Sequence, residues 1–410
     1  MLINLIRMIY MENNVAIKAK LGNIKKIEGA DKIVSADIVL DNVPISTVVV
    51  GVDSVEGQEI IYFDSNLSLS DKFLEDNPSL KTYLAKGNRV RCVKLRGVIS
   101  NGIAVSVDVF TKYVDKVPAS FTSLGGIEIC KKWVPVYPTV SSSNKVGRAK
   151  NAKKENIVIP ELFNFHIDTQ QLIRNLHKVS PNDVISISRK VHGTSAIVSH
   201  TKIKNKQSFV DKLLRRNETK WGYLFASRTV VKNSDGGVHD DLWTTVGQQF
   251  VGKLHKGETV YYEIVGYFPG TQTYIQKGYD YGCAVGEYKI AVYRITTTND
   301  DGVVTEYSWA SMKERCKELN VPHVHEFFFG RALELVPMGE NWGVEFAKYL
   351  KSTYLEKNAW DNISKKVPDE GVVIRVEAKD ITVFKYKSEA FFLQESQAAD
   401  AGEIDTEAVE

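Results

Sequence analysis

The chain has 410 residues, of which 43% are hydrophobic and 25% charged, and its net charge is +3. This length predicts at least two domains. The composition is that of a soluble globular protein, and it excludes a disordered chain or a strongly basic nucleic-acid binder as the overall class. The four cysteines form no C-x-x-C pair, which argues against a zinc ribbon or a disulfide framework and favours a reducing, cytoplasmic setting.

Residues 1–10 are apolar, but ten residues are too few to span a bilayer, which needs about 20. They also lack the small-residue cleavage site of a secretory signal. Met11, followed by Glu-Asn-Asn, is the more natural start of the protein. We therefore expect residues 1–10 to be dispensable, and we expect no association with a membrane.

Residues 11–135 have the pattern of an all-β module. Apolar alternation or β-branched runs at 15–21, 45–50, 59–63 and 89–95 predict short strands. Their spacing is typical of a small barrel or sandwich, and residues 71–83 predict a short helix or a loop. Four basic residues lie on the last predicted strand and its turn: Arg89, Arg91, Lys94 and Arg96. Arg89 and Arg91 would share a face and suit a nucleic-acid backbone, although a solvated charged strand is an alternative.

Residues 136–156 are rich in serine and lysine without apolar periodicity, which predicts a basic linker. A second domain is predicted over 157–395, with strands at 184–188, 224–231, 259–267, 289–295, 371–376 and 381–386. The spacing of Trp309, Met312, Cys316 and Leu319 predicts an amphipathic helix, and that of Phe346, Leu350 and Tyr354 a second one. Residues 396–410 are acidic and predict a disordered tail.

The segment 185–195 predicts a strand that ends on Lys190 and turns at Gly193. A lysine at a strand end, followed by a glycine turn and hydroxyl residues, can meet a nucleotide phosphate, because glycine lets the backbone approach the ligand. A desolvated lysine near other cations also loses its proton more readily and becomes a nucleophile. The alternative is a surface lysine beside a turn glycine.

Four later segments favour the first interpretation: 227–228, 262–266, 370–375 and 385–388. Together with 190–193, and in this order, they resemble the motifs of the covalent nucleotidyltransferases, which include ATP-dependent DNA ligases, RNA ligases and mRNA capping enzymes. Segments 24–34, 64–65 and 90–102 resemble the N-terminal OB-type module of one class of polynucleotide ligases. The chain is thus similar to ATP-dependent RNA ligases of that class over most of its length.

This resemblance implies an α+β chain, in which an N-terminal OB-type β-barrel precedes a nucleotidyltransferase domain. That domain would be ATP-grasp-like, with antiparallel sheets and flanking helices. The implied activity is the joining of RNA 3′-OH and 5′-phosphate ends with ATP, through lysyl-AMP and RNA-adenylate. The implied partners are RNA and ATP with Mg²⁺ or Mn²⁺, and we expect a monomer.

The resemblance also implies roles for single residues. Lys190 matches the family nucleophile, and Lys385 and Lys387 match the lysines that contact the α-phosphate. Glu263 and Glu370 match carboxylates near the ribose and the water shell of the metal. Arg228 matches an arginine near the ribose, Tyr293 an aromatic that stacks on adenine, and His192 and Gly193 belong to the nucleotide-binding turn. From this we expect Glu370 and Lys385 to be partly exposed in a cleft, where substitution by alanine would stop joining without unfolding the domain.

Alternatives remain open at several positions. Glu370 could be a turn residue, Tyr293 a core residue, and the H-x-H pair His323 and His325 could bind metal, although packing histidines are the simpler interpretation. The commonest family pattern has Asp where this chain has His192, which weakens a metal-binding role there. Only 23 residues follow Lys387, too few for the C-terminal OB domain of DNA ligases and capping enzymes. The competing functions are a DNA ligase, and an RNA-binding protein with an inactive transferase domain.

Overall fold

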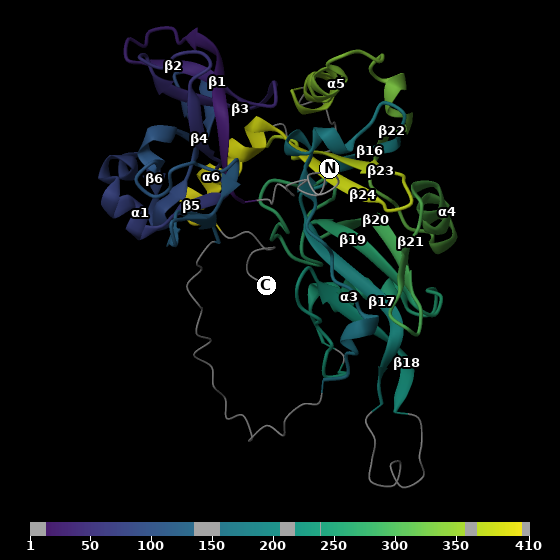
Figure 1. The fold of residues 1–410 in the computed structure, drawn as a ribbon. Coiled ribbons are helices and arrows are strands. Elements are labelled where there is room, and N and C mark those ends of the chain that lie inside the picture. Colours follow the sequence, from purple (N-terminus) through teal and green to yellow (C-terminus); the bar gives the residue numbers. More distant parts are fainter. Residues whose placement is uncertain (1–13, 135–155, 206–217, 238, 357–366, 404–410) are drawn as a thin grey trace, which may run out of the picture.

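The computed structural model describes residues 14–134, 156–205, 218–237, 239–356 and 367–403. The predictions for residues 1–10, for most of the basic linker and for the end of the tail lie outside these ranges. The described chain is a mixed α+β structure of mostly antiparallel sheets with few helices (Figure 1), as expected. None of its helices is long and apolar enough to cross a membrane.

The N-terminal module, residues 14–134, is built on a sheet in the order β10-β4-β1-β2-β3, with β11 also paired to β1. Its strands are β1 (Ala16–Lys26), β2 (Ile33–Leu40), β3 (Val43–Gly51), β4 (Glu59–Phe63), β10 (Ile103–Ser106) and β11 (Ser120–Phe121). The apolar run of β4 is buried on both faces: Ile61 and Phe63 pack in one core, and Ile60 and Tyr62 in another. The described pairings run along an open path from β10 to β3, so they do not by themselves establish a closed barrel.

A second sheet of the module has the order β14-β5-β7-β6, and two hairpins and a helix complete the module. These elements are β5 (Leu67–Leu69), α1 (Asp71–Asp76), β6 (Leu84–Ala85), β7 (Arg89–Val90), β8 (Cys92–Leu95), β9 (Val98–Asn101), β12 (Ser123–Leu124), β13 (Ile127–Glu128) and β14 (Cys130–Lys132). The predicted strand 89–95 is wrong as a single unit. The strand is interrupted at Arg91, which belongs to neither β7 nor β8, and these two strands lie in different sheets. Arg89 and Arg91 therefore do not share a strand face.

The second domain contains two five-stranded sheets. Sheet I has the order β15-β24-β23-β16-β22, and sheet II the order β18-β17-β19-β20-β21. The strands of sheet I are β15 (Gln170–Gln171), β16 (Val184–Lys190), β22 (Glu326–Arg331), β23 (Gly371–Val376) and β24 (Thr382–Lys387). Those of sheet II are β17 (Thr194–Lys204), β18 (Thr219–Ser227), β19 (Glu258–Gly266), β20 (Tyr288–Thr298) and β21 (Val304–Glu306).

Helices cover both sheets. α3 (Leu242–Gly247) and α4 (Trp309–Leu319) pack in the core of sheet II, and α5 (Trp342–Leu350) packs on sheet I. The prediction of α4 is confirmed: Ser308 caps its start by accepting from the Ser311 amide, and the helix stops at Asn320, which has a left-handed backbone. The second predicted helix is confirmed as α5, and its apolar repeat continues into a π-helical turn over Lys351–Leu355.

The last helix, α6 (Glu389–Asp400), departs from the predicted tail. Disorder is wrong for residues 396–400, which form the last part of this helix. The three acidic residues of α6 have cationic partners on other elements. Glu389 pairs with Lys351 at 3.0 Å, Glu395 pairs with Lys387, and Asp400 pairs with Arg89. In Figure 1 the yellow α6 leaves β24 and lies against the blue strands of the N-terminal module. The two bodies also meet through a buried ion pair of Arg174 with Asp64.

Candidate active site

A cavity of about 400 Å³ lies between sheets I and II. Sheet I contributes the ends of β16, β23 and β24 to its walls, and sheet II contributes β17, β19 and β20. Eight of the nine residues predicted to bind nucleotide line this one cavity: Lys190, His192, Arg228, Glu263, Tyr293, Glu370, Lys385 and Lys387. Segments up to 197 residues apart in the chain therefore converge on one site.

Strand register brings the charged residues of sheet I together. Lys190 pairs with Gly371 on β23, and Gly371 pairs with Lys387 on β24, so the two lysines flank the strand that Glu370 precedes. The Lys190 ammonium lies 2.7 Å from Glu370 Oε1, and the Lys387 ammonium lies 3.3 Å from the same oxygen. Gly371 has φ of 142°, and a Cβ there would lie 2.1 Å from the Tyr386 carbonyl oxygen. Only glycine therefore permits this approach of the strands.

Glu370 is only 3% exposed, which contradicts the expectation of a partly exposed residue. Burial by itself raises the pKa of a carboxyl, but here the charges of Lys190 and Lys387 outweigh it and lower the pKa of Glu370 to about 2. Lys385 is half-buried, as expected. Burial, with Lys387 and Lys190 nearby, lowers the pKa of Lys385 to about 8. The pKa of Lys387 is instead raised, because Glu395 and Glu370 outweigh its burial.

Tyr293 reaches the cavity through a β-bulge in sheet II. Tyr261 pairs with Arg294 and Tyr262 pairs with Val292, so Tyr293 is the extra residue of β20. A bulge re-aims side chains, and here both Tyr293 and Arg294 line the cavity although they are consecutive. The Tyr293 hydroxyl lies 2.9 Å from the Ser195 hydroxyl. The Tyr293 side chain therefore lies at the cavity wall, beside Ser195.

The turn after Lys190 is fixed by packing. The Gly193 amide donates to Glu263 Oε1 at 3.1 Å, and a Cβ on Gly193 would lie 2.2 Å from the Ile264 carbonyl oxygen. This glycine is therefore required by the approach of β19, and it is not among the residues that line the cavity. The His192 amide donates to the Tyr281 hydroxyl at 2.8 Å. Its ring packs edge-to-face against Tyr279 and Phe391.

Several residues that line the cavity carry no sequence signal that we recognised. Asp168, which follows a 3₁₀ turn, forms an ion pair with Arg228, and Lys132 of the N-terminal module lies 3.9 Å from Asp168. His166 packs edge-to-face on Tyr293, and its pKa is lowered to about 3 by burial and by the charges of Arg228 and Arg294. The imidazole is therefore neutral at pH 7. These residues lie more than 20 positions before Lys190, in a segment without periodicity.

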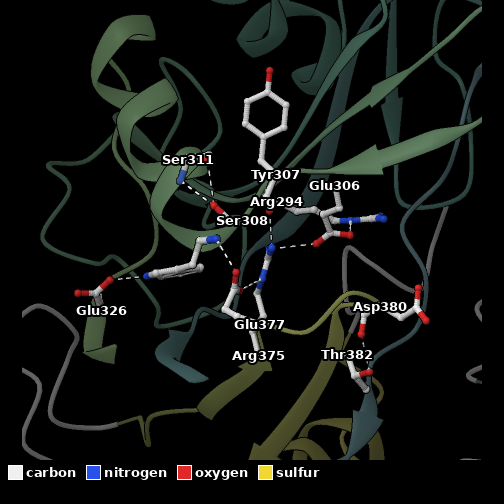
Figure 2. A network of polar contacts seen from close by, with 11 residues as sticks. Arg294, Glu306, Tyr307, Ser308, Ser311, Glu326, Arg375, Glu377, Asp380 and Thr382 are labelled. Carbon is white, nitrogen blue, oxygen red and sulfur yellow. Dashed lines mark hydrogen bonds and ion pairs between the residues drawn. The ribbon is translucent and has the colours of Figure 1, made fainter. Parts of the chain in front are cut away.

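Arg294, Glu306 and Arg375, which line the cavity, belong to a partly buried network of polar contacts (Figure 2). Arg375 on β23 crosses to Glu306 on β21 at 3.0 Å, and Arg294 on β20 reaches the other oxygen of Glu306 at 2.7 Å. Arg375 also donates to Glu377 at 2.6 Å and to the Tyr307 carbonyl. This network ties sheet I to sheet II. Polar contacts with little access to water restrict the relative movement of the two cavity walls.

No family model matches the chain, and no curated protein is similar to it in sequence. Its fold, however, is found in solved structures of an RNA ligase from Naegleria gruberi. A variant with AMP and Mn is 17% identical over 92% of this chain and 98% of that one, with a TM-score of 0.58. A variant with ATP and Mn is 16% identical over the same shares, also at 0.58, and the enzyme with PPi is 17% identical over 93% and 98%, again at 0.58.

This chain has the fold of an RNA ligase. The predicted resemblance is thereby confirmed at the level of the fold, over nearly the whole of both chains. In this fold all five motif segments border the same cavity, although they are far apart in the sequence.

The four basic residues predicted to bind nucleic acid have different environments within the ligase fold. Arg89 is 3% exposed and donates to Ser396 and Asp400 of α6, so its predicted contact with nucleic acid is wrong. Arg91 is half-buried. Lys94 and Arg96 are exposed at the tip of the β8–β9 hairpin and remain candidates.

The carboxylates of Glu263 and Glu370 suit a hard divalent cation whose other ligands come from substrate and water. Among the described residues no cluster of three or more His, Cys, Asp or Glu side chains could hold a metal. The Nδ1 atom of His323 instead lies at hydrogen-bond distance, 2.7 Å, from the Val324 carbonyl oxygen. Glu370 Oε2 is buried and has no hydrogen-bond partner within the described chain, and Glu263 lines the same cavity. Mg²⁺ typically binds through one or two carboxylates, waters and phosphates, so this pair fits it.

Proposed function

We propose that this protein is an ATP-dependent RNA ligase that joins 3′-OH and 5′-phosphate ends through an AMP linked to Lys190. The observation that carries the proposal is the Lys190–Glu370–Lys387 cluster, which lies at the wall of a cavity with an aromatic ring on the opposite sheet. Cations there would neutralise a phosphate, and Tyr293 would stack on a base. The shared fold with a ligase whose structures hold ATP or AMP supports the same chemistry.

In the first step, Lys190 must lose a proton and leave Glu370 before it can attack. The proton passes to water or to a phosphate oxygen, while Glu370 remains paired with the Lys387 ammonium as a carboxylate. The lone pair of Nζ then forms a bond to the α-phosphorus as the bond to pyrophosphate breaks, and pyrophosphate takes that electron pair. Lys385 and Lys387 offset the charge on the α-phosphate oxygens.

In the later steps, a 5′-phosphate oxygen of RNA attacks the same phosphorus and displaces the Lys190 nitrogen. The 3′-OH then attacks the activated 5′-phosphate, a phosphodiester forms and AMP leaves. Glu370 and Glu263 would hold Mg²⁺ or Mn²⁺ through water, and the ion would add positive charge beside the reacting phosphate. The proposal includes an OB-type N-terminal module that binds RNA with Lys94 and Arg96, a monomeric state and a cytoplasmic location.

The test is covalent labelling. The protein is incubated with α-³²P-labelled ATP and Mg²⁺ or Mn²⁺, denatured, and run on a gel. A labelled band is expected for the natural chain and none for Lys190→Met. An absent band, or a band that persists in the variant, would refute the proposal. RNA binding without any nucleotide consumption would instead favour a binding protein with an inactive transferase domain.

The polynucleotide is tested with nicked duplexes that differ only in the sugar that carries the 3′-OH. Faster sealing of the nick with ribose at that end is expected. Equal rates on an all-DNA nick would favour the DNA ligase alternative.

A further inference from the structure

Helix α6 connects the nucleotide cavity to the N-terminal module. Toward the cavity, Glu395 lies 2.9 Å from the Lys387 ammonium, which is itself 3.3 Å from Glu370. Phe391, one turn earlier, is buried, and the Lys387 ammonium lies 4.9 Å from the centre of its ring. Helix α6 therefore places a carboxylate and an aromatic ring beside Lys387.

A second face of α6, with Ser396 and Asp400, contacts the N-terminal module. Arg89 donates to the Ser396 hydroxyl and carbonyl oxygens, each at 3.1 Å, and forms an ion pair with Asp400. The Cys92 amide also donates to the Ser396 hydroxyl, at 3.0 Å. Arg89 and Ser396 are buried, at 3% and 2% exposure, so this contact is a specific, buried connection between α6 and the N-terminal module.

The spacing along α6 explains how one helix serves both bodies. Phe391 and Glu395 are four residues apart and share the face toward Lys387. Ser396 and Asp400 are also four apart and share the face toward the module. Consecutive helical residues diverge by about 100°, so Glu395 and Ser396 point to different bodies from adjacent positions. A shift of the helix at Ser396 therefore moves Glu395 as well.

We propose that the N-terminal module positions Lys387 for lysine adenylylation through α6, with Arg89 and Glu395 as positioning residues. Glu395 keeps the Lys387 ammonium between two carboxylates, its own and that of Glu370. Without Glu395, the ammonium would pair with Glu370 alone, and less of its positive charge would be available to the α-phosphate. Arg89 acts one step further away, by fixing the helix that carries Glu395. This inference rests on the proposed ligase function, and it assigns to the module a role in the step that involves no RNA.

The test measures the rate of lysyl-AMP formation in the full chain without RNA, over a range of ATP concentrations. Arg89→Ala and Glu395→Ala are each expected to lower the rate at saturating ATP by about tenfold, with the KM for ATP little changed, because the lost contact matters most in the transition state. The double variant is expected to be no slower than the worse single variant, since both residues act through one helix. Arg89→Lys is expected to recover part of the rate.

Lys112→Ala is the matched control. Lys112 is a cation of the same module that contacts an aspartate and an aromatic ring, Asp76 at 4.0 Å and Tyr113 at 5.0 Å, as Arg89 contacts Asp400 and the ring of Trp133. Within the described chain, neither of these contacts of Lys112 involves α6. It should keep the natural rate. If Arg89→Ala lowers the melting temperature enough to obscure the result, Asp400→Asn, at a side chain that is 38% exposed, takes its place with a smaller expected loss.

Natural-rate labelling by Arg89→Ala, or by Asp400→Asn in its place, would overturn the inference. So would multiplicative losses in the double variant. If the natural chain itself takes no label, the ligase proposal fails instead, so the two failures are distinct.

Discussion

Replacement of Glu370 by glutamine is the sharpest test of the electrostatic reasoning. The amide keeps the shape of the carboxyl but removes its charge beside Lys190 and Lys387, whose ammonium groups lie 2.7 and 3.3 Å from Oε1. Both lysines have little access to solvent, with side chains 24% and 17% exposed. Loss of the central anion would therefore leave two neighbouring cations with little screening by water.

The magnitude follows from the pKa of Glu370, which falls from 4.5 to about 2 on folding. At about 1.4 kcal/mol for each pKa unit, the ionised carboxyl contributes about 3 kcal/mol of stability. Because the folded pKa is the lower one, this contribution is complete above about pH 4.5 and disappears as the pH falls to about 2. For a domain of this size, about 3 kcal/mol corresponds to a melting temperature lower by about 6–12 °C.

The assay is denaturant unfolding of the natural chain and of Glu370→Gln at pH 7, 5, 4 and 3. The stability difference should be largest at pH 7 and should shrink below pH 4.5. Glu314→Gln, which breaks an exposed pair with Lys317, serves as the control and should cost less than about 1 kcal/mol. Equal stability of the two proteins at pH 7, or a difference independent of pH, would show that the cluster is not held by this charge.

Three further predictions concern single properties of the site. The affinity for AMP should fall as the pH rises through about 8, where Lys385 loses its charge, and titration calorimetry should find no such fall in Lys385→Arg. Tyr293→Phe should bind AMP nearly as well as the natural chain, while Tyr293→Ala should bind it roughly tenfold more weakly; equal losses would assign the binding to the bond with Ser195. Lys94→Ala combined with Arg96→Ala should weaken RNA binding and lower its salt dependence, with lysyl-AMP formation unaffected; an unchanged salt slope would remove the hairpin from the RNA surface.

The burial of Glu370 also changes what an alanine variant can report. The sequence predicts loss of joining without loss of stability at this position. The structure predicts loss of both, because Glu370 is 3% exposed and shares one oxygen with two lysines. Joining assays of Glu370 variants therefore need a parallel measurement of the folded fraction. Lys385 is half-buried, and for it the original expectation stands as a prediction.

Local patterns in the sequence were sufficient to predict most strands of the second domain, whereas the residues expected at its cavity came from the resemblance to the ligase motifs. The strand before Lys190, the two strands after Glu370 and helix α4 all follow from apolar alternation, β-branched runs and three- and four-residue steps. The order of the motif segments indicated the ligase fold. The strand and helix signals survive in a single sequence because each depends on neighbours within about ten residues.

Other features were decided only by the tertiary structure, because they depend on contacts between distant segments. Nothing near Tyr293 marks it as the extra residue of a bulge, since the bulge exists only in register with β19. Arg89 has the sequence context of a surface cation, yet it is buried because α6 supplies Ser396 and Asp400 from 307 and 311 positions away. Residues 396–400 likewise belong to helix α6, although the acidic composition of 396–410, taken alone, predicts disorder, and Asp400 forms an ion pair with the distant Arg89.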